Sequence, residues 1–306
     1  MVFVLVGTAV VIFTIMHFIP NDVTKAILGA EATEAEREVL RQRLGLNDPY
    51  IVQLFRYLFN VFIKLDFGTS YIYNKPVIQE LISRIPRTLF LGCSIIIFNT
   101  LLGIPLGIIA GLHQNKWQDT LSMIIALVFV SVPSFWLALQ LVNIFSVQLD
   151  WLPAFGIGSF KHYIMPIFAA AMMGTAANAR QMRSSLLEVI RADYIVSARS
   201  KGVSNRNVVL KHMLPNALIP VVTGLGVGLG RSIAGSVIIE SVFSIPGVGM
   251  YLLTGINNAD YPVVQGSIVV LSFFSAIVML LLDLLYAQID PRIKSQYSGE
   301  MGGVKK

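Results

Sequence analysis

Six long apolar runs, separated by shorter polar stretches, restrict what this chain can fold into. Each run can form a helix of about 20 residues, the length that crosses the hydrocarbon core of a bilayer. Only 13% of the residues are charged, whereas a soluble domain carries about a quarter. In hydrocarbon, a helix satisfies its backbone hydrogen bonds within one segment. The sequence therefore predicts an all-α integral membrane protein with six transmembrane helices, at about residues 1–20, 88–112, 119–147, 163–183, 215–240 and 263–287.

The basic residues predict which loops face the cytoplasm. The loop 184–214 and the helix end before it carry Arg180, Arg183, Arg191, Arg199, Lys201, Arg206 and Lys211 against Glu188 and Asp193. Loop 113–118 contains Lys116, whereas loop 241–262 contains no Lys or Arg. Because short loops rich in Lys and Arg stay inside, we expect loops 113–118 and 184–214 in the cytoplasm. The tail 291–306 and the amino terminus then also lie inside, and residues 88–290 form a five-helix core.

Residues 21–87 are then predicted to be an extracytoplasmic segment of short helices. Thr33 and Glu36 form a capping box that starts one helix, and Gly45 is placed to end it in the left-handed conformation. A second helix is expected from Asp48-Pro49, because proline fits the first helical turn. Its apolar stripe would consist of Ile51, Leu54, Phe55, Leu58 and Phe59. We expect both amphipathic helices on the outer membrane surface, followed by turns and a helix entry at residues 66–70, Pro76 and residues 84–88.

Glycines recur at every fourth position in the second predicted transmembrane helix, at Gly103, Gly107 and Gly111. This spacing lets a neighbouring helix approach closely. We expect close helix packing here rather than a role in helix motion.

Two charged residues fall in the fifth predicted transmembrane helix, Arg231 and Glu240. A charge at the centre of such a helix costs roughly 2.5–3.5 kcal/mol, so each should face protein or water. Nine residues make about two and a half helical turns, which puts the two on opposite faces and disfavours a direct pair. Two interpretations remain for each: it lines a translocation path, or it makes structural hydrogen bonds.

No pattern in the sequence supplies catalysis or metal binding. The phosphate-binding run Gly-x-x-x-x-Gly-Lys-Ser/Thr is absent, so the chain is not itself an ATPase. His-Glu-x-x-His and Gly-x-Ser-x-Gly are also absent, and the single cysteine, Cys93, excludes an intrachain disulfide. The net charge of +6 suits loops at a membrane rather than a nucleic-acid partner. We expect no enzyme activity, no cofactor and no metal.

The basic loop carries a spaced motif. Ser197 and Ala198 are followed by three variable positions, Gly202, nine more residues and an ending in Leu214-Pro215. This arrangement resembles the cytoplasmic coupling loop of the membrane subunit of ATP-binding-cassette importers, in the branch of oligopeptide, dipeptide and nickel permeases.

The resemblance covers nearly the whole chain. Further stretches similar to this branch are residues 66–70, 132–136, 240–249, 260–266 and 290–292. Two positions depart from the motif: Val196 replaces a frequent acidic residue, and His212 replaces an apolar one. The family's short basic segment before the first helix is missing, which suggests a trimmed start.

The resemblance implies a type I importer permease in a bacterial or archaeal inner membrane. The expected partners are a second, similar permease, two cytoplasmic ATPases and an extracytoplasmic solute-binding protein. The chain would form half of a translocation path for peptides, nickel or a metal–opine chelate. A short helix in the coupling loop would sit in a cleft of one ATPase. The residues implied in this coupling are Ser197, Ala198, Arg199, Lys201, Gly202, Leu214 and Pro215.

Two other classes of protein are alternatives to an importer permease. A secondary transporter or channel is one alternative, but a secondary transporter would carry inverted repeats with broken helices, and the sequence shows no repeated pair of broken spans. An intramembrane enzyme would need a nucleophile and base, or a metal site, and neither is evident.

Overall fold

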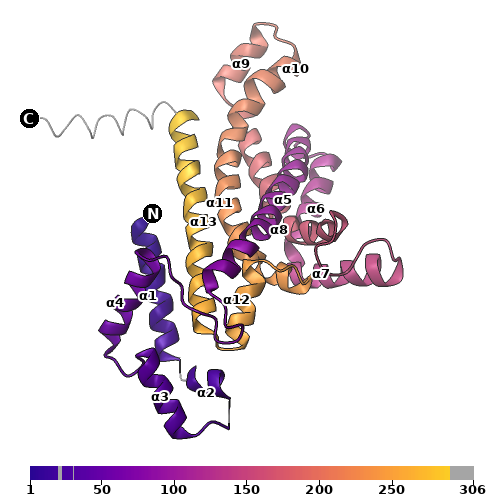
Figure 1. Cartoon of the computed structure of the whole chain (residues 1–306). Helices are drawn as coiled ribbons and strands as arrows, with labels where there is room; N and C mark the ends of the chain where they lie inside the picture. The colour runs from indigo at the N-terminus through magenta and orange to yellow at the C-terminus, as the bar shows by residue number, and fades with distance from the viewer. Residues whose placement is uncertain (20–22, 30, 290–306) are drawn as a thin grey trace, which may run out of the picture. The chain divides into compact units, whose positions relative to one another are not determined.

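The structure is a computed structural model that describes residues 1–19, 23–29 and 31–289 (Figure 1). Its helices are α1 (Val2–Phe18), α2 (Val23–Leu28), α3 (Glu34–Leu44), α4 (Tyr50–Phe62), α5 (Val77–Leu112), α6 (Trp117–Ser131), α7 (Ser134–Leu141), α8 (Lys161–Ile190), α9 (Asp193–Ser200), α10 (Asn205–Asn207), α11 (Leu214–Val242), α12 (Val248–Asn257) and α13 (Tyr261–Ile289). Two π-helical segments are η1 (Val142–Gln148) and η2 (Val208–Met213). No strand occurs among the described residues, so the all-α prediction is confirmed. The tail 291–306 and the stretch 290–292 lie outside them.

Each predicted transmembrane run is helical. However, fewer than six helices of the described chain are both long enough and apolar enough to cross a membrane. Three helical stretches of the described chain are long and apolar enough to cross a membrane: Val77–Leu112, Asn205–Gly230 and Tyr261–Leu281. The predicted run 119–147 is broken at Pro133 and bends by 94°, and it makes a fourth span only if both halves are counted together. The helix α1 is apolar but short, and the second half of α8 is polar.

Two element boundaries differ from the prediction. The helix α5 starts at Val77, directly after Pro76, so the helix entry lies at Pro76 and residues 84–88 lie inside the helix. The loop 241–262 contains α12, a helix that the sequence did not predict. Both differences place more helix in the segments that the sequence assigned to the outside.

The chain forms two compact units. One combines Met1–Phe90, Phe155–Ile157 and Ile233–Ala276, and the other contains Leu91–Ala154 and Gly158–Ser232 with the end of α13. The helices α5, α11 and α13 therefore contribute residues to both units.

In the first unit, the short helices before α5 form as predicted. Thr33 and Glu36 make the complete capping box, and Gly45 ends α3 with a φ of 65°. The helix α4 packs against α1 through Val61 and Ala9, and the two lie side by side in Figure 1. The predicted stripe is split, because Leu58 faces this contact while Phe55 and other apolar residues of α4 are exposed. One side of α4 therefore packs on α1, and its other side carries exposed apolar residues.

In the second unit, the glycine face of α5 lies directly against α8. A Cβ on Gly107 would lie 2.5 Å from the carbonyl oxygen of Ala179, and one on Gly103 would lie 2.7 Å from that of Thr175. Gly111 is equally close to the side chain of Leu186. The helices are in contact at the backbone here, which confirms the prediction of close packing.

Candidate functional site

The predicted coupling loop folds into a tip of short helices between α8 and α11. In Figure 1, α9 and α10 lie at the amino end of α11. The helix α8 continues to Ile190, so the first part of the predicted loop 184–214 is helical. The loop proper begins at Arg191 and contains α9, α10 and η2.

Gly202, two residues after the last residue of α9, terminates this helix through its backbone conformation. Gly202 has a φ of +75°, and the N–H of Val203 donates to the carbonyl of Ala198, while that of Gly202 donates to the carbonyl of Arg199. These two bonds form a Schellman motif, which needs a left-handed residue at this position. No atom lies within 4 Å of a Cβ built on Gly202. Within this chain, glycine is therefore required by the turn and not by a close neighbour.

The inner face of α9 belongs to the chain's own core. Ile195 is fully buried in a cluster with Val208 and Met213, which also includes Met182 and Leu186 of α8. Ala198 packs against the same cluster. The small side chain of Ala198, which the resemblance assigned to an ATPase contact, is thus explained by packing within the chain.

The outer face of α9 is exposed. Tyr194 and Val196 are 47% and 57% exposed, and the polar side chains of Ser197, Ser200 and Lys201 are exposed as well. Arg199 is also exposed, but its side chain lines a pocket together with residues of loop 113–118. The predicted coupling residues Ser197 and Lys201 therefore lie on a surface that a partner can reach, together with Tyr194, which the motif did not single out.

The Leu214-Pro215 ending lies where η2 passes into α11. Leu214 packs against the buried cluster, and Pro215 is exposed. Proline has no N–H and its ring disturbs the preceding turn of a helix. The π-helical turn η2 immediately before it is the kind of local irregularity that often accompanies functional sites.

A partly buried ion pair joins α8 to the start of α6. Arg183 donates from Nε and Nη2 to the two carboxylate oxygens of Asp119, over 2.6 and 2.8 Å. Asp119 also accepts a hydrogen bond from the backbone N–H of Asn115 over 3.0 Å. Arg183, one of the basic residues at the helix end before the loop, therefore pairs its charge within the chain. A bidentate pair of this kind fixes the relative orientation of the two side chains in addition to stabilising their charges.

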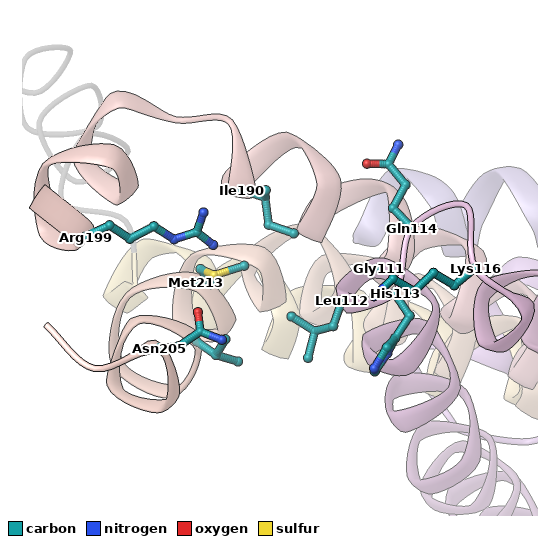
Figure 2. Close-up of a pocket in the computed structure, with 10 residues that line it drawn as sticks. Gly111, Leu112, His113, Gln114, Lys116, Ile190, Arg199, Asn205 and Met213 are labelled. Atoms are coloured by element: carbon teal, nitrogen blue, oxygen red, sulfur yellow. The ribbon is translucent and has the colours of Figure 1, made fainter.

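A pocket lies behind the tip, within the second unit. It is lined by Gly111, Leu112, His113, Gln114, Lys116, Ile190, Arg199, Asn205, Val209 and Met213. In Figure 2 the Arg199 side chain reaches from α9 toward Met213. The structure therefore brings the coupling loop together with loop 113–118, a contact that sequence spacing could not reveal.

Glu240 lies in the first unit, and its carboxylate is fully buried. Oε1 accepts hydrogen bonds from the hydroxyls of Thr88 (2.8 Å) and Ser236 (2.9 Å), and Oε2 accepts from the N–H of Met250 (3.0 Å). The structural interpretation of this residue is thus the one that the contacts favour. Arg231 lies on the backbone of α11, but its side chain lies outside the described part of the chain.

Two stretches far apart in sequence meet in the same unit. Ser70 donates from Oγ to Asp260 over 2.6 Å, although 190 positions separate them. Gly266 lies close to Phe67 and Val77. The stretches 66–70 and 260–266, each a weak signature alone, therefore form one contact.

The sequence matches two described families. The first, "Binding-protein-dependent transport system inner membrane component", matches residues 103–295. The second, "Binding-prot-dependent transport system membrane comp, N-term", matches residues 1–92. Together they cover most of the chain.

Individual relatives and structures agree with these matches. The glutathione transport system permease protein GsiC of Salmonella paratyphi A is 41% identical over 286 residues, which cover 94% of this chain and 93% of that protein. The dipeptide transport system permease protein DppB of Alkalihalophilus pseudofirmus is 40% identical over 319 residues, covering 95% and 96%. An inward-facing MetNI methionine ABC transporter is similar in structure, with a TM-score of 0.59 and 19% identity over 70% of this chain and 97% of that one. An amino acid ABC transporter crystallised with histidines has a TM-score of 0.57 and 16% identity, over 69% and 94%.

Proposed function

This chain belongs to the family of binding-protein-dependent transport system inner membrane components, and from this we propose that it passes peptides across the membrane and is driven through α9 by a cytoplasmic ATPase. It is a permease subunit of an ATP-binding-cassette importer of the peptide branch, with the fold of a type I permease. A subunit of this family works with an ATPase and a solute-binding protein.

The exposure of the outer face of α9 is the observation that supports the coupling proposal. Its inner face is held by Ile195 in a buried cluster, whereas Tyr194, Ser197 and Lys201 are exposed. A short helix that is packed on one side and accessible on the other can transmit movement of a bound ATPase to the helices on which it packs. Through α8 and α11, on which α9 rests, ATP-driven movement would rock the spans between inward- and outward-open states.

The orientation proposed for the chain follows its charges. The tip and loop 113–118 are basic, and basic loops stay in the cytoplasm. The two termini then lie inside, and the segment 21–87 lies outside, where a solute-binding protein would deliver its cargo. A second, similar permease would complete the path, with two ATPases below the pair.

The substrate proposed is a small peptide. Relatives of about 40% identity are named for glutathione and for dipeptide transport, and both are short peptides with free carboxylates. Arg231, in α11, is the residue proposed to line the path and favour such ligands, because its guanidinium can bind a carboxylate with two parallel hydrogen bonds. Nickel and metal–opine chelates were expected from the branch and have less support.

The test is uptake by the reconstituted importer. The permease pair, its ATPases and its binding protein are placed in sealed vesicles, and entry of a labelled dipeptide and of labelled glutathione is measured. We expect uptake only with both ATP and the binding protein. Uptake driven by an ion gradient without ATP would instead support the secondary-transporter alternative.

A further inference from the structure

The pocket behind the tip has a composition that the coupling role does not explain. Its volume is about 420 Å³. Coupling uses the outer face of α9, whereas this pocket lies on the inner side, between Arg199 and the loop that follows α5 (Figure 2). A cavity of this size can hold a small polar group with several contacts.

The lining of the pocket is positively charged. Arg199 and Lys116 carry permanent charges, and no Asp or Glu lines the cavity. Within the described part of the chain, neither cation has an ion pair or side-chain hydrogen bond. Asp119, in the first turn of α6, does not neutralise them, because Arg183 and the N–H of Asn115 occupy its carboxylate.

Neutral donors complete a set suited to an oxyanion. Gln114 and Asn205 each bring a side-chain amide to the lining. His113 donates from Nδ1 to the carbonyl of Ile109 over 3.0 Å, so its Nε2 is the atom that a ligand would meet. Guanidinium, ammonium and amide groups around one cavity match the acceptor oxygens of a phosphate.

The rest of the pocket points to an amphiphile rather than a free ion. Leu112, Ile190, Val209 and Met213 supply apolar lining. Trp117, the residue after Lys116, is 71% exposed, and exposed tryptophan is enriched where a membrane meets water. Basic pockets at the cytoplasmic ends of transmembrane helices are places where phospholipid headgroups bind.

We infer that this pocket binds the phosphate headgroup of an anionic membrane phospholipid. The inference rests on the proposed orientation, which places the tip at the cytoplasmic membrane surface. A headgroup held between Lys116 and Arg199 joins loop 113–118 to the inner side of α9. Anionic lipid would then support the position of the helix that meets the ATPase.

The test is lipid retention by the assembled importer. The complex is purified from nanodiscs of phosphatidylcholine doped with phosphatidylglycerol, and native mass spectrometry counts the lipids that stay bound. We expect selective retention of phosphatidylglycerol, with an affinity about fivefold lower in Lys116→Gln, because one basic residue is removed from the site. Lys211→Gln is the matched control, since Lys211 is an exposed lysine of η2, in the other basic loop, and does not line the pocket; it should retain the lipid as the unmodified complex does.

Three results would overturn the inference: no preference for phosphatidylglycerol, equal loss in the two lysine variants, or displacement of the lipid by inorganic phosphate. The last result would assign the pocket to a free phosphate anion. Lipid retention is measured without transport, so its failure leaves ATP-driven uptake untouched, and failure of uptake leaves a positive lipid result interpretable.

Discussion

Thr88 donates a hydrogen bond from Oγ1 to Oε1 of Glu240 over 2.8 Å, although 152 positions separate the two residues. The same Thr88 oxygen accepts from the N–H of Val248 over 2.8 Å, and Oε2 of Glu240 accepts from the N–H of Met250. These two N–H groups belong to the first turn of α12, whose cap residue, Gly247, has no side chain to offer. Thr88 and Glu240 therefore cap α12 from two other helices, and the negative carboxylate suits the amino end of a helix.

Removing this carboxylate should destabilise the permease. Glu240→Ala leaves the hydroxyl of Thr88 and the N–H of Met250 without their acceptor, at about 1–3 kcal/mol for each buried group. We expect a lower melting temperature for the purified complex. Glu188→Ala, an exposed glutamate on α8, is the control and should stay within about 0.5 kcal/mol. A Glu240 variant with unchanged melting but reduced uptake would contradict the structural role and favour the path-lining one.

Two substitutions at Gly202 test whether glycine is needed for the left-handed turn or for the close approach of a partner. Gly202→Val forces a β-branched residue into the left-handed region, at about 1–2 kcal/mol, whereas Gly202→Asn is tolerated there. If the turn is what matters, substrate-stimulated ATP hydrolysis should fall in the Val variant and persist in the Asn variant. Loss in both, with the ATPases still co-purifying, would show that the partner excludes any side chain at this position. Normal coupling in the Val variant would contradict both reasons.

The topology is tested by single cysteines in a Cys93→Ala background. Asn205 and Asn47 are both exposed, and the charge distribution assigns them to opposite sides of the membrane. A membrane-impermeant maleimide should label Asn205→Cys only in inside-out vesicles. It should label Asn47→Cys only in spheroplasts, whose inner membrane is intact. Labelling of both from one side would exclude the proposed arrangement.

Arg231→Gln tests the proposed recognition of carboxylates. The change keeps polarity and approximate length but removes the charge. Uptake of a dipeptide should fall, while assembly and basal ATP hydrolysis persist. Collapse of assembly would assign Arg231 a structural role, and unchanged uptake would remove it from the path.

Local sequence chemistry predicted much of the fold. The capping box at Thr33 and the end of α3 at Gly45 depend only on residues within one helix, and both form as expected. The glycine spacing of α5 predicted its close contact because every fourth residue of a helix lies on one face. The short helix before Gly202 was likewise expected from the motif and is present as α9.

The features that sequence could not supply depend on distant contacts. The cap of α12 joins Thr88 to Glu240, and the pair Arg183–Asp119 spans 64 positions. Helical spacing predicted only that Glu240 and Arg231 lie on opposite faces of their helix. The resemblance implies a partner contact for Ala198, and the structure adds its packing against the chain's own buried cluster. A motif identifies which residues matter without stating what they touch.

The most direct measurement of the coupling claim is photocrosslinking from the outer face of α9. Tyr194, 47% exposed on α9, is replaced by p-benzoylphenylalanine, which keeps the aromatic ring. Tyr73, 49% exposed in the segment assigned to the outside, serves as the matched control. In the assembled importer, the account predicts a crosslink from position 194 to the ATPase subunit and none from position 73. Capture of the ATPase from position 73, or a failure of position 194 to reach it in a complex that hydrolyses ATP, would contradict the account.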